Sequence, residues 1–408
     1  MNTHSKVLSI PILVAALGYF VDIYDLVLFS VVRKPSLLAI GVPLAALEKS
    51  GLFLLNIQMV GMLVGGLMWG VLGDKKGRLS VLFGSIILYS VANILNAYVT
   101  DITQYGILRF VAGVGLAGEL GAGITLVSEI LHKDKRGWGT TIVATVGVSG
   151  AMLAGLLAVM EVPWTTCYII GGVLGLLLLL MRVSMYESGM YKSTELSKHK
   201  RGSLSMIFLD KKRFLTYLKC ILVGLPIWYV IGILITLSPE LGRELHIQGE
   251  ISPAKSIMYC YAGVTIGDML SGILSQLLRS RKRVLQYFVF ATLLMVIAYF
   301  FMDGASVQSF YLLFAVLGFA AGYWAVLITT ASEQFGTNIR ATVTTSVPNF
   351  IRASLVPISF FYTFLQTAGT TKLNSALITG IICCSVAFIA ASLLKESFHK
   401  DLDYHEIA

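Results

Sequence analysis

The chain has 408 residues, of which 56% are hydrophobic and only 13% are charged, and its mean hydropathy is +0.80. A water-soluble protein of this length cannot bury so much apolar surface in one core, so the composition excludes an ordinary soluble domain. The formal net charge is +9. Its cations lie in the links between apolar segments, where they act as a topology signal, so we expect no nucleic-acid partner.

Twelve apolar segments, each long enough to cross a bilayer, follow one another along the chain. We predict spanning helices over residues 9–33, 50–72, 79–99, 102–131, 139–162, 164–184, 214–238, 255–279, 284–302, 306–334, 341–367 and 371–394. The first segment contains two aspartates and is too long for the h-region of a signal peptide, so we interpret it as a helix. The five cysteines have no metal-ligand spacing and are expected to be packing residues.

Lysine and arginine gather in the links that follow the second, fourth, eighth and tenth segments, whereas the intervening links contain fewer cations. The one substantial polar link, residues 185–213, separates the sixth and seventh segments. By the positive-inside rule, both termini and this link are cytoplasmic. Arg33, Lys34 and Arg243 oppose this orientation.

Two short segments indicate an internal repeat. In SEILHKDKRGWGTT, Glu129 precedes Arg136, and in SEQFGTNIRATVTT, Glu333 precedes Arg340. Matching positions differ by 204, half the length of the chain. This spacing predicts two homologous halves of six helices each.

The repeat gives the predicted architecture of an all-α membrane protein. It has an N-terminal six-helix bundle (1–184), a cytoplasmic linker (185–213) and a C-terminal six-helix bundle (214–408). Two such bundles face each other across a central cavity. The substrate site then lies near the bilayer midplane, and rocking of the bundles alternates its access.

The stretch GVLGDKKGRLSVLFG, residues 70–84, resembles the signature loop of the major facilitator superfamily between its second and third helices. Gly70, Asp74, Gly77 and Arg78 match its Gly-x-x-x-Asp-x-x-Gly-Arg pattern. The resemblance covers essentially the whole chain. The onset RFVAGVG of the fourth segment, with YES and LKES at the ends of the two halves, is similar to the sugar-porter branch.

The first segment resembles a second branch more closely. Phe20, Asp22, Tyr24 and Asp25 are similar to the Phe-x-x-Asp-x-Tyr-Asp stretch of proton:phosphate symporters, with the phenylalanine spacing shifted by one. This resemblance implies proton coupling.

Arginines in the fourth and eleventh segments also match positions of these symporter families. Arg109 is followed ten residues later by Glu119, a position where metabolite:proton symporters place a glutamate and phosphate symporters an aspartate. Arg352 lies twelve residues after Arg340, where the phosphate family has a substrate-binding lysine. The seventh segment lacks the aspartate of the phosphate symporters, which argues against phosphate as the substrate.

Asp22 and Asp25 are three residues apart, on one face of the first helix and a little beyond the midplane. Ionisable residues at this depth are costly and are functional by default. A buried acid that exchanges a cationic partner for a proton couples transport to protons; a permanent structural ion pair is the alternative. The sugar-porter resemblance implies an Asp25–Arg109 pair that opens when Asp25 is protonated. Arg109 otherwise holds the first and fourth helices together.

Arg352 is the strongest indication of the substrate, because a planar guanidinium matches a carboxylate or phosphate. Pro348 and Pro357 flank it and loosen the helix. A salt bridge to Glu119 or Asp268 is the alternative for Arg352. Glu119 is expected to be a second proton site or a substrate contact. The other residues predicted at the substrate site are Asp22, Asn349, Trp228, Tyr229, Tyr323 and Trp324, of which the aromatic ones are alternatively core packing.

Charged residues at the cytoplasmic helix ends of both halves are predicted to be latches of the outward-open state. They are Asp74, Arg78, Glu129, Arg136, Glu333 and Arg340. Asp268 lies near the middle of its segment and is assigned to the same gating set or to a cation of the cavity.

These features predict a proton-coupled symporter that takes up a small anionic or zwitterionic metabolite by alternating access. We expect a monomer in a bacterial inner membrane, surrounded by lipid, with the proton as coupling ion and no cofactor. An antiporter that exports a metabolite or drug, and a solute sensor without net flux, are the alternatives. The sequence has no P-loop, HExxH, CxxC or nucleophile-elbow pattern, so neither ATP-driven transport nor enzyme activity is expected.

Overall fold

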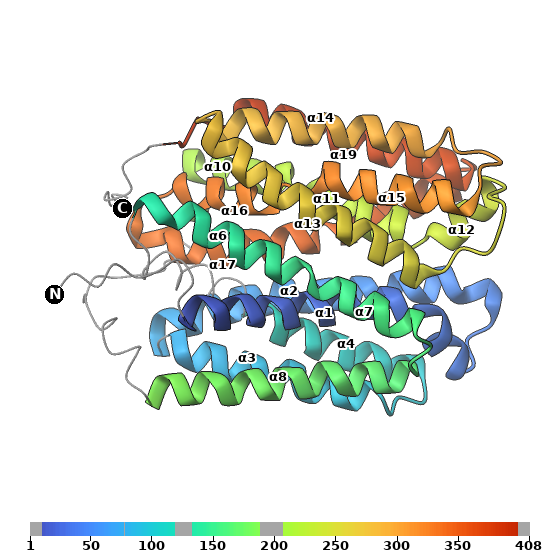
Figure 1. Ribbon diagram of the computed structural model, residues 1–408, viewed down its shortest axis with the longest axis horizontal. Helices are drawn as coiled ribbons and strands as arrows, with labels where there is room; N and C mark the ends of the chain where they lie inside the picture. The colour runs from blue at the N-terminus through green and yellow to red at the C-terminus, as the bar shows by residue number, and fades with distance from the viewer. Residues whose placement is uncertain (1–9, 77, 119–132, 188–206, 399–408) are drawn as a thin grey trace.

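The computed structural model is built of helices and describes residues 10–76, 78–118, 133–187 and 207–398. The helices run along the long axis of the molecule (Figure 1). α1 (Ile10–Ala39) begins and α19 (Lys372–Leu393) ends at the same end, here called the proximal end. The opposite end is called the distal end.

The N-terminal half continues from α1 with a short 3₁₀ turn, η1, and then with long helices. These are η1 (Leu44–Ala46), α2 (Leu47–Lys76), α3 (Arg78–Asn96), α4 (Ile102–Leu116), α6 (Lys133–Val148), α7 (Gly150–Val159) and α8 (Trp164–Glu187). α6 and α7 are consecutive pieces of one spanning unit.

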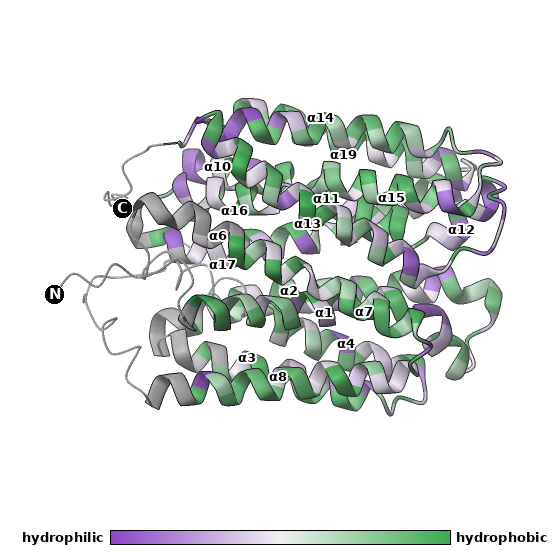
Figure 2. Ribbon diagram, in the orientation of Figure 1, coloured by the Kyte–Doolittle hydropathy of each residue, from purple (hydrophilic) through white to green (hydrophobic). Residues whose placement is uncertain are grey.

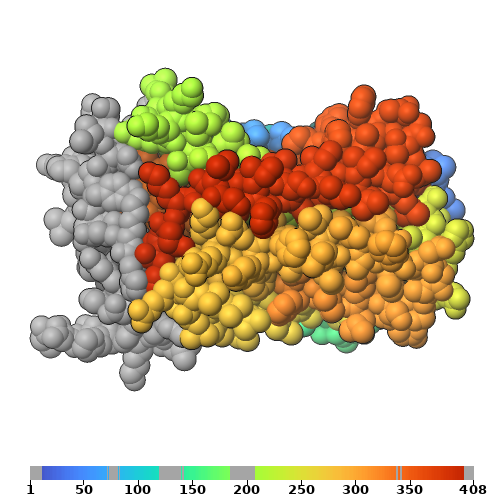
Figure 3. Space-filling model, turned by 90° about the horizontal axis from the view of Figure 1, so that it is seen from above, coloured from blue at the N-terminus to red at the C-terminus, as the bar shows by residue number. Residues whose placement is uncertain are grey.

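The C-terminal half contains several broken helices. Its elements are α10 (Lys211–Val223), α11 (Leu225–Tyr229), the π-helical η3 (Val230–Ile235), α12 (Ser238–Glu244), α13 (Pro253–Leu277), α14 (Arg281–Tyr299), α15 (Val307–Ala321), α16 (Trp324–Glu333), α17 (Thr337–Ala353), α18 (Leu355–Thr367) and α19. On the outer face of this half, α19 packs between α10 and α14 (Figure 3).

The side of the bundle is apolar, and hydrophilic residues concentrate toward its ends (Figure 2). Large exposed apolar side chains such as Leu180 and Phe360 point outward from the helices. Within the described ranges, nine helices are long and apolar enough to span a membrane, and two shorter apolar helices accompany them. Each predicted segment contains a described helix or consecutive helices, although residues 119–131 of the fourth segment lie outside the described ranges. The predicted multi-pass membrane fold is therefore confirmed.

Several helices break near the middle of the bundle. Pro357 has no N–H to offer the carbonyl of Ala353, and α17 ends at Ala353. α15 ends at Ala321, and α16 starts at Trp324 after a two-residue interruption. In a membrane, such breaks are tolerated where the freed backbone groups are buried in protein or line a cavity. The breaks therefore indicate that a functional site is to be expected near the middle of the bundle.

The two halves are joined at the distal end by ion pairs. Arg33 Nη2 lies 2.6 Å from Glu240 Oε1, and both side chains are buried. Glu48 Oε2 lies 3.0 Å from Lys372 Nζ, and its Oε1 accepts a hydrogen bond from Tyr362. From the sequence, Arg33 was interpreted only as a cation that opposes the expected orientation. Its buried partner Glu240 explains why an arginine is tolerated at this position.

Glycines allow α2 and α4 to pack backbone against backbone. A Cβ atom at Gly65 would overlap the carbonyl oxygen of Val114, and one at Gly61 would overlap that of Phe110. Five residues further along α2, a Cβ atom at Gly70 would have no neighbour within 4 Å. The close approach is therefore local to the middle of α2.

This difference gives a matched test of the packing. Gly65→Ala should destabilise the protein by about 1–3 kcal/mol, because backbone atoms cannot move aside cheaply. Gly70→Ala should be neutral or slightly stabilising, since alanine has the higher helix propensity. Thermal unfolding of both purified variants measures the effect. Equal unfolding temperatures would contradict the packing.

Candidate functional site

A buried ion pair connects the two halves near the middle of their helices. Asp22 of α1 and Arg352 of α17 approach to 3.2 Å between Oδ2 and Nη2, and their side chains are 0% and 1% exposed. The Nε and Nη1 atoms of Arg352 have no hydrogen-bond partner among the described residues. The guanidinium therefore has donors to spare after pairing with Asp22. Asp22 is the salt-bridge partner observed for this arginine. Asp268, one of the predicted alternatives, bonds elsewhere, and Glu119 lies outside the residues that the structure describes.

The position of Asp22 on α1 explains this pairing. Arg33 follows eleven residues later, which returns to the same face of an α-helix, and it also reaches across to the C-terminal half. Asp25 is turned by about 60° from Asp22, since three residues make about 300° of helix rotation. One face of α1 thus bonds to the C-terminal half, and the neighbouring face, with Asp25, turns toward the N-terminal half.

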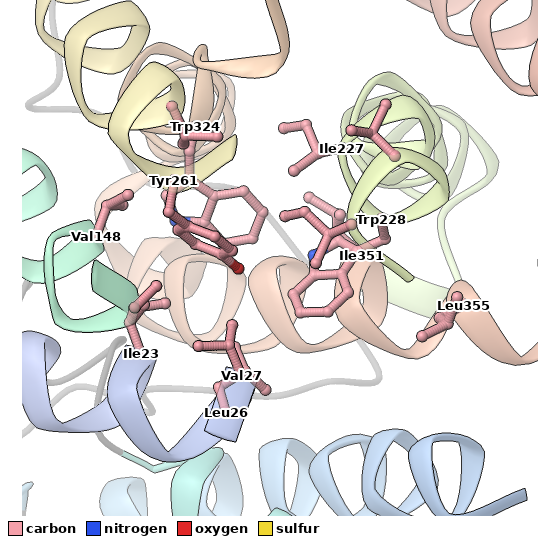
Figure 4. Packing of buried hydrophobic residues seen from close by; sticks show 14 of the residues in the cluster. Ile23, Leu26, Val27, Val148, Ile227, Trp228, Tyr261, Trp324, Ile351 and Leu355 are labelled. Atoms are coloured by element: carbon pink, nitrogen blue, oxygen red, sulfur yellow. The ribbon is translucent and has the colours of Figure 1, made fainter. Parts of the chain in front are cut away.

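Aromatic and aliphatic side chains surround the Asp22–Arg352 pair. The Arg352 Cζ atom lies 5.9 Å from the ring centroid of Trp324, a cation–π geometry. Figure 4 shows Trp324 and Tyr261 on one side of the space above α17 and Trp228 on the other, with Ile23 and Val27 of α1 below. Such a site combines a buried ion pair with flat apolar walls, and its guanidinium suits an organic anion with an apolar body.

Asp268 of α13 holds the start of α16, where Trp324 lies. Its Oδ1 atom accepts the Ala325 N–H at 2.7 Å, and the residue is fully buried. The first N–H groups of a helix have no partner within the helix, and a carboxylate there also interacts favourably with the helix dipole. The structure therefore places Asp268 at the helix break, remote from the proximal end where the gating set was predicted. Through α16 it supports the ring of Trp324 beside Arg352.

Asp25 and Arg109 do not form the ion pair expected from the sugar-porter resemblance. Neither carboxylate oxygen of Asp25 has a hydrogen-bond partner among the described residues, although Arg109 and Asn93 are close enough to act on its charge. Arg109 instead donates to Gln58. Its Cζ atom also lies 5.2 Å and 5.9 Å from the ring centroids of Phe29 and Tyr168 respectively.

Asp25 packs directly against α8. A Cβ atom at Gly171 would overlap its Oδ1 atom, so only glycine leaves room for the carboxylate at this position. Asp25 is fully buried within the N-terminal half. The two first-helix acids, predicted on one face, thus occupy separate environments.

Three of the remaining predicted substrate residues, Asn349, Tyr229 and Tyr323, use their polar groups within the protein. Asn349 Nδ2 donates to the carbonyls of Ala117 and Thr345, each at 2.9 Å, and so bridges α17 and the end of α4. Tyr229 donates to the Ala376 carbonyl at 2.6 Å. Tyr323 donates to the Val223 carbonyl at 2.9 Å. The two tyrosine hydroxyls therefore hold helices of the C-terminal half together.

The predicted latches of the C-terminal half lie at its proximal end. Glu333 pairs with Arg281 at 3.3 Å and accepts a hydrogen bond from Ser397. Arg340 donates to the carbonyls of Ser332 and Phe335 near the end of α16. Glu119, Asp74, Arg78, Glu129 and Arg136 lie outside the residues whose side chains the structure describes.

No group of three or more His, Cys, Asp or Glu side chains suited to a metal ion occurs within the described ranges. The arrangement instead contains buried charges in the middle of a helical bundle. The Major Facilitator Superfamily sequence model matches residues 15–354. The chain belongs to the major facilitator superfamily. Like its relatives in that family, it is a membrane transporter and not an enzyme.

Curated relatives cover most of this major facilitator chain. A NiaP protein of Bacillus subtilis (strain 168), whose name gives niacin and nicotinamide as its proposed cargo, is 25% identical over 96% of both chains. The benzoate transport protein of Acinetobacter baylyi (strain ATCC 33305 / BD413 / ADP1) is 26% identical over 81% of this chain and 78% of its own. A solved structure of the proton:xylose symporter XylE matches with a TM-score of 0.71 at 16% identity, covering 96% of this chain and 97% of that one.

Sequence reasoning missed several polar residues of this transporter. Arg33 and Glu240 form the distal ion pair, while Gln58 and Asn93 lie beside Arg109 and Asp25. All four are buried. A polar residue inside an apolar segment is the signal that identifies them, but uncharged amides are easily overlooked beside aspartate and arginine.

The role of Asp268 can be tested by comparing two variants. Asp268→Ala leaves the buried Ala325 N–H without an acceptor and should destabilise the transporter by about 1–3 kcal/mol. Asp268→Asn retains a side-chain oxygen and should lose less. Thermal unfolding of the purified variants distinguishes them. If asparagine is as damaging as alanine, the charge of Asp268 matters rather than its hydrogen bond.

Glu396 gives a pH-dependent test at the proximal end. Partial burial raises the pKa of this carboxyl, but hydrogen bonds from Ser280 and from the backbone N–H groups of Phe398, Arg281 and Ser397 bring the net pKa below its ordinary value of 4.5. A depressed pKa in the folded state stabilises the protein above the unfolded pKa, and this contribution is lost as the pH falls through the folded value. Glu396→Gln should therefore lower the unfolding temperature at pH 7, and the gap should narrow in acid below 4.5. A gap that widened in acid would contradict this.

Proposed function

We propose that this transporter is a proton-coupled symporter that takes up a small aromatic carboxylate across a bacterial inner membrane. The observation that carries the proposal is the buried Asp22–Arg352 pair between the halves, set among aromatic rings. The names of the relatives, which include carriers of benzoate, niacin and 4-hydroxybenzoate, support an aromatic acid as the cargo.

The substrate carboxylate competes with Asp22 for Arg352. Two carboxylates beside one buried guanidinium repel each other, so binding of the substrate anion favours protonation of Asp22. A carboxylate on Arg352 and a proton on Asp22 together leave the centre with the same net charge as the empty ion pair. This equivalence links one substrate to one proton, because either alone places an unbalanced charge in the membrane interior.

Asp25 and Arg109 form a second acid–base set in the N-terminal half. Asp25 is buried, and its carboxylate has no hydrogen-bond partner among the described residues, so a proton there removes a costly charge. We assign Asp25 to proton coupling, together with Arg109, which modulates its charge. Glu119 is kept as a further proton site or substrate contact.

Alternating access requires the contacts between the halves to break in turn. The Arg33–Glu240 and Glu48–Lys372 pairs close the distal end, and the latches around Glu333 lie at the proximal end. Rocking of the halves about the central pair exposes the site to one side and then to the other. Protons are the coupling ion, and we expect the monomer to be the functional unit.

Uptake of radiolabelled benzoate into proteoliposomes tests the central pair. Arg352→Lys keeps the charge but loses the planar fork, and should weaken uptake about tenfold or more. Asp22→Asn removes the exchangeable proton. It should abolish accumulation driven by a pH gradient while exchange of internal for external substrate persists.

Wild-type protein in the presence of a protonophore provides the control for accumulation. Accumulation by Asp22→Asn that still follows the pH gradient would exclude Asp22 as the coupling group. Wild-type uptake that is unaffected by the protonophore would exclude proton coupling altogether.

A further inference from the structure

The indole N–H of Trp228 is a buried polar group for which the proposed function has no role. Trp228 lies in α11 and is only 5% exposed, and its Nε1 atom has no hydrogen-bond partner among the described residues. An indole nitrogen can only donate, and a buried donor without an acceptor is unfavourable. The group is therefore suited to an acceptor that a ligand supplies.

The helix contacts place Trp228 opposite Arg352. A Cβ atom at Gly224 would meet the side chain of Ile351, and one at Gly232 would meet that of Leu355. Trp228 is four residues from each glycine and shares their face of the helix. It therefore lies opposite the turn from Ile351 to Leu355, which contains Arg352.

Figure 4 shows the orientation of the ring. Trp228 lies beside Ile351, and its nitrogen is on the side that faces the rings of Tyr261 and Trp324. The surrounding labelled side chains, Ile227 and Val27 among them, are apolar. The indole N–H thus points toward the aromatic space beside Arg352.

Several unpaired N–H donors border this space, together with the hydroxyl of Tyr261, which can both donate and accept (Figure 4). Nε and Nη1 of Arg352 and Nε1 of Trp228 are all N–H groups without a partner in the described part of the chain. A plain benzoate satisfies only the arginine, since its ring has no acceptor. A ring that carries a second acceptor can satisfy both positions.

We propose that Trp228 determines specificity by donating a hydrogen bond to an acceptor on the substrate ring, such as a ring nitrogen or a phenolic oxygen. This proposal rests on the proposed function, because it takes the carboxylate to be held by Arg352. The substrate class is thereby narrowed from aromatic carboxylates to those with a second acceptor remote from the carboxylate. Apolar analogues are discriminated against because they leave the indole N–H unpaired.

The indole N–H of Trp324 also has no partner among the described residues. Trp324 is nonetheless the control, because it contacts Arg352 through its ring and its nitrogen lies beside Tyr261 (Figure 4). Replacing it by phenylalanine should affect all aromatic acids alike. The two tryptophans therefore make a matched pair.

The experiment measures dissociation constants of benzoate, nicotinate, isonicotinate and 4-hydroxybenzoate for the purified full-length protein. For the wild type, at least one of the three acceptor-bearing acids should bind about tenfold more tightly than benzoate. Trp228→Phe should reduce that ratio to about one, and Trp324→Phe should retain it. No preference in the wild type, an unchanged ratio in Trp228→Phe, or loss of the ratio only in Trp324→Phe would each overturn the proposal.

Failure of the proposed function gives a different result. In that case neither benzoate nor its analogues bind the wild type, or all bind Arg352→Ala as tightly as the wild type. If Trp228→Phe does not fold, N-methylnicotinate replaces it as the test on the wild type, because its ring nitrogen has no lone pair. If the wild type binds N-methylnicotinate as much more tightly than benzoate as it does nicotinate, the proposal is overturned.

Discussion

The cost of an unpaired charge in the membrane interior governs this structure. Asp22 and Arg352 come from different halves, and each is fully buried, so each depends on the other for charge balance. In the proposed function, the pair is a contact between the halves that a substrate carboxylate and a proton together replace without leaving a net charge behind. An apolar contact at the same place could also hold the halves together. Binding of an anion or a proton would not, however, weaken such a contact, so it could not change how the halves are arranged.

α1 transmits this constraint along the molecule. Its face with Asp22 and Arg33 bonds to the C-terminal half at two levels, about three helical turns apart. The adjoining face turns Asp25 toward α8 within the N-terminal half. Any movement of the halves that separates Asp22 from Arg352 must also act on Arg33, because both side chains project from one rigid helix. Asp25 lies on the same helix, so the proposed protonation of Asp25 would be connected through α1 to the contacts between the halves.

The sequence predicted most of the fold and part of the site. Hydropathy located the spanning helices because every lipid-exposed backbone group must be satisfied inside a helix. An arginine isolated in an apolar segment predicted a functional role for Arg352, and the structure shows this residue buried and paired with Asp22. The partners in the ion pairs could not be predicted from the sequence, because they depend on which helix faces meet. Arg33 was counted only as a cation that opposes the expected orientation, because the topology rule does not anticipate a buried partner such as Glu240. Asp268 was grouped with the latches because the break at Gly322 cannot be inferred from an apolar run.

The break before α16 also explains why, in the proposed function, side chains rather than backbone N–H groups bind the substrate anion. Half-helix N-termini often bind anions in membrane transporters, and α16 begins beside Arg352. Here the Ala325 N–H at that terminus already bonds to Asp268, whose carboxylate also offsets the positive end of the helix dipole. The terminus consequently fixes the ring of Trp324 in place, and its attraction for a second anion is reduced. In the function proposed above, binding of the carboxylate then falls to Arg352, the same group that Asp22 must release, and this shared dependence is what would couple the anion to the proton.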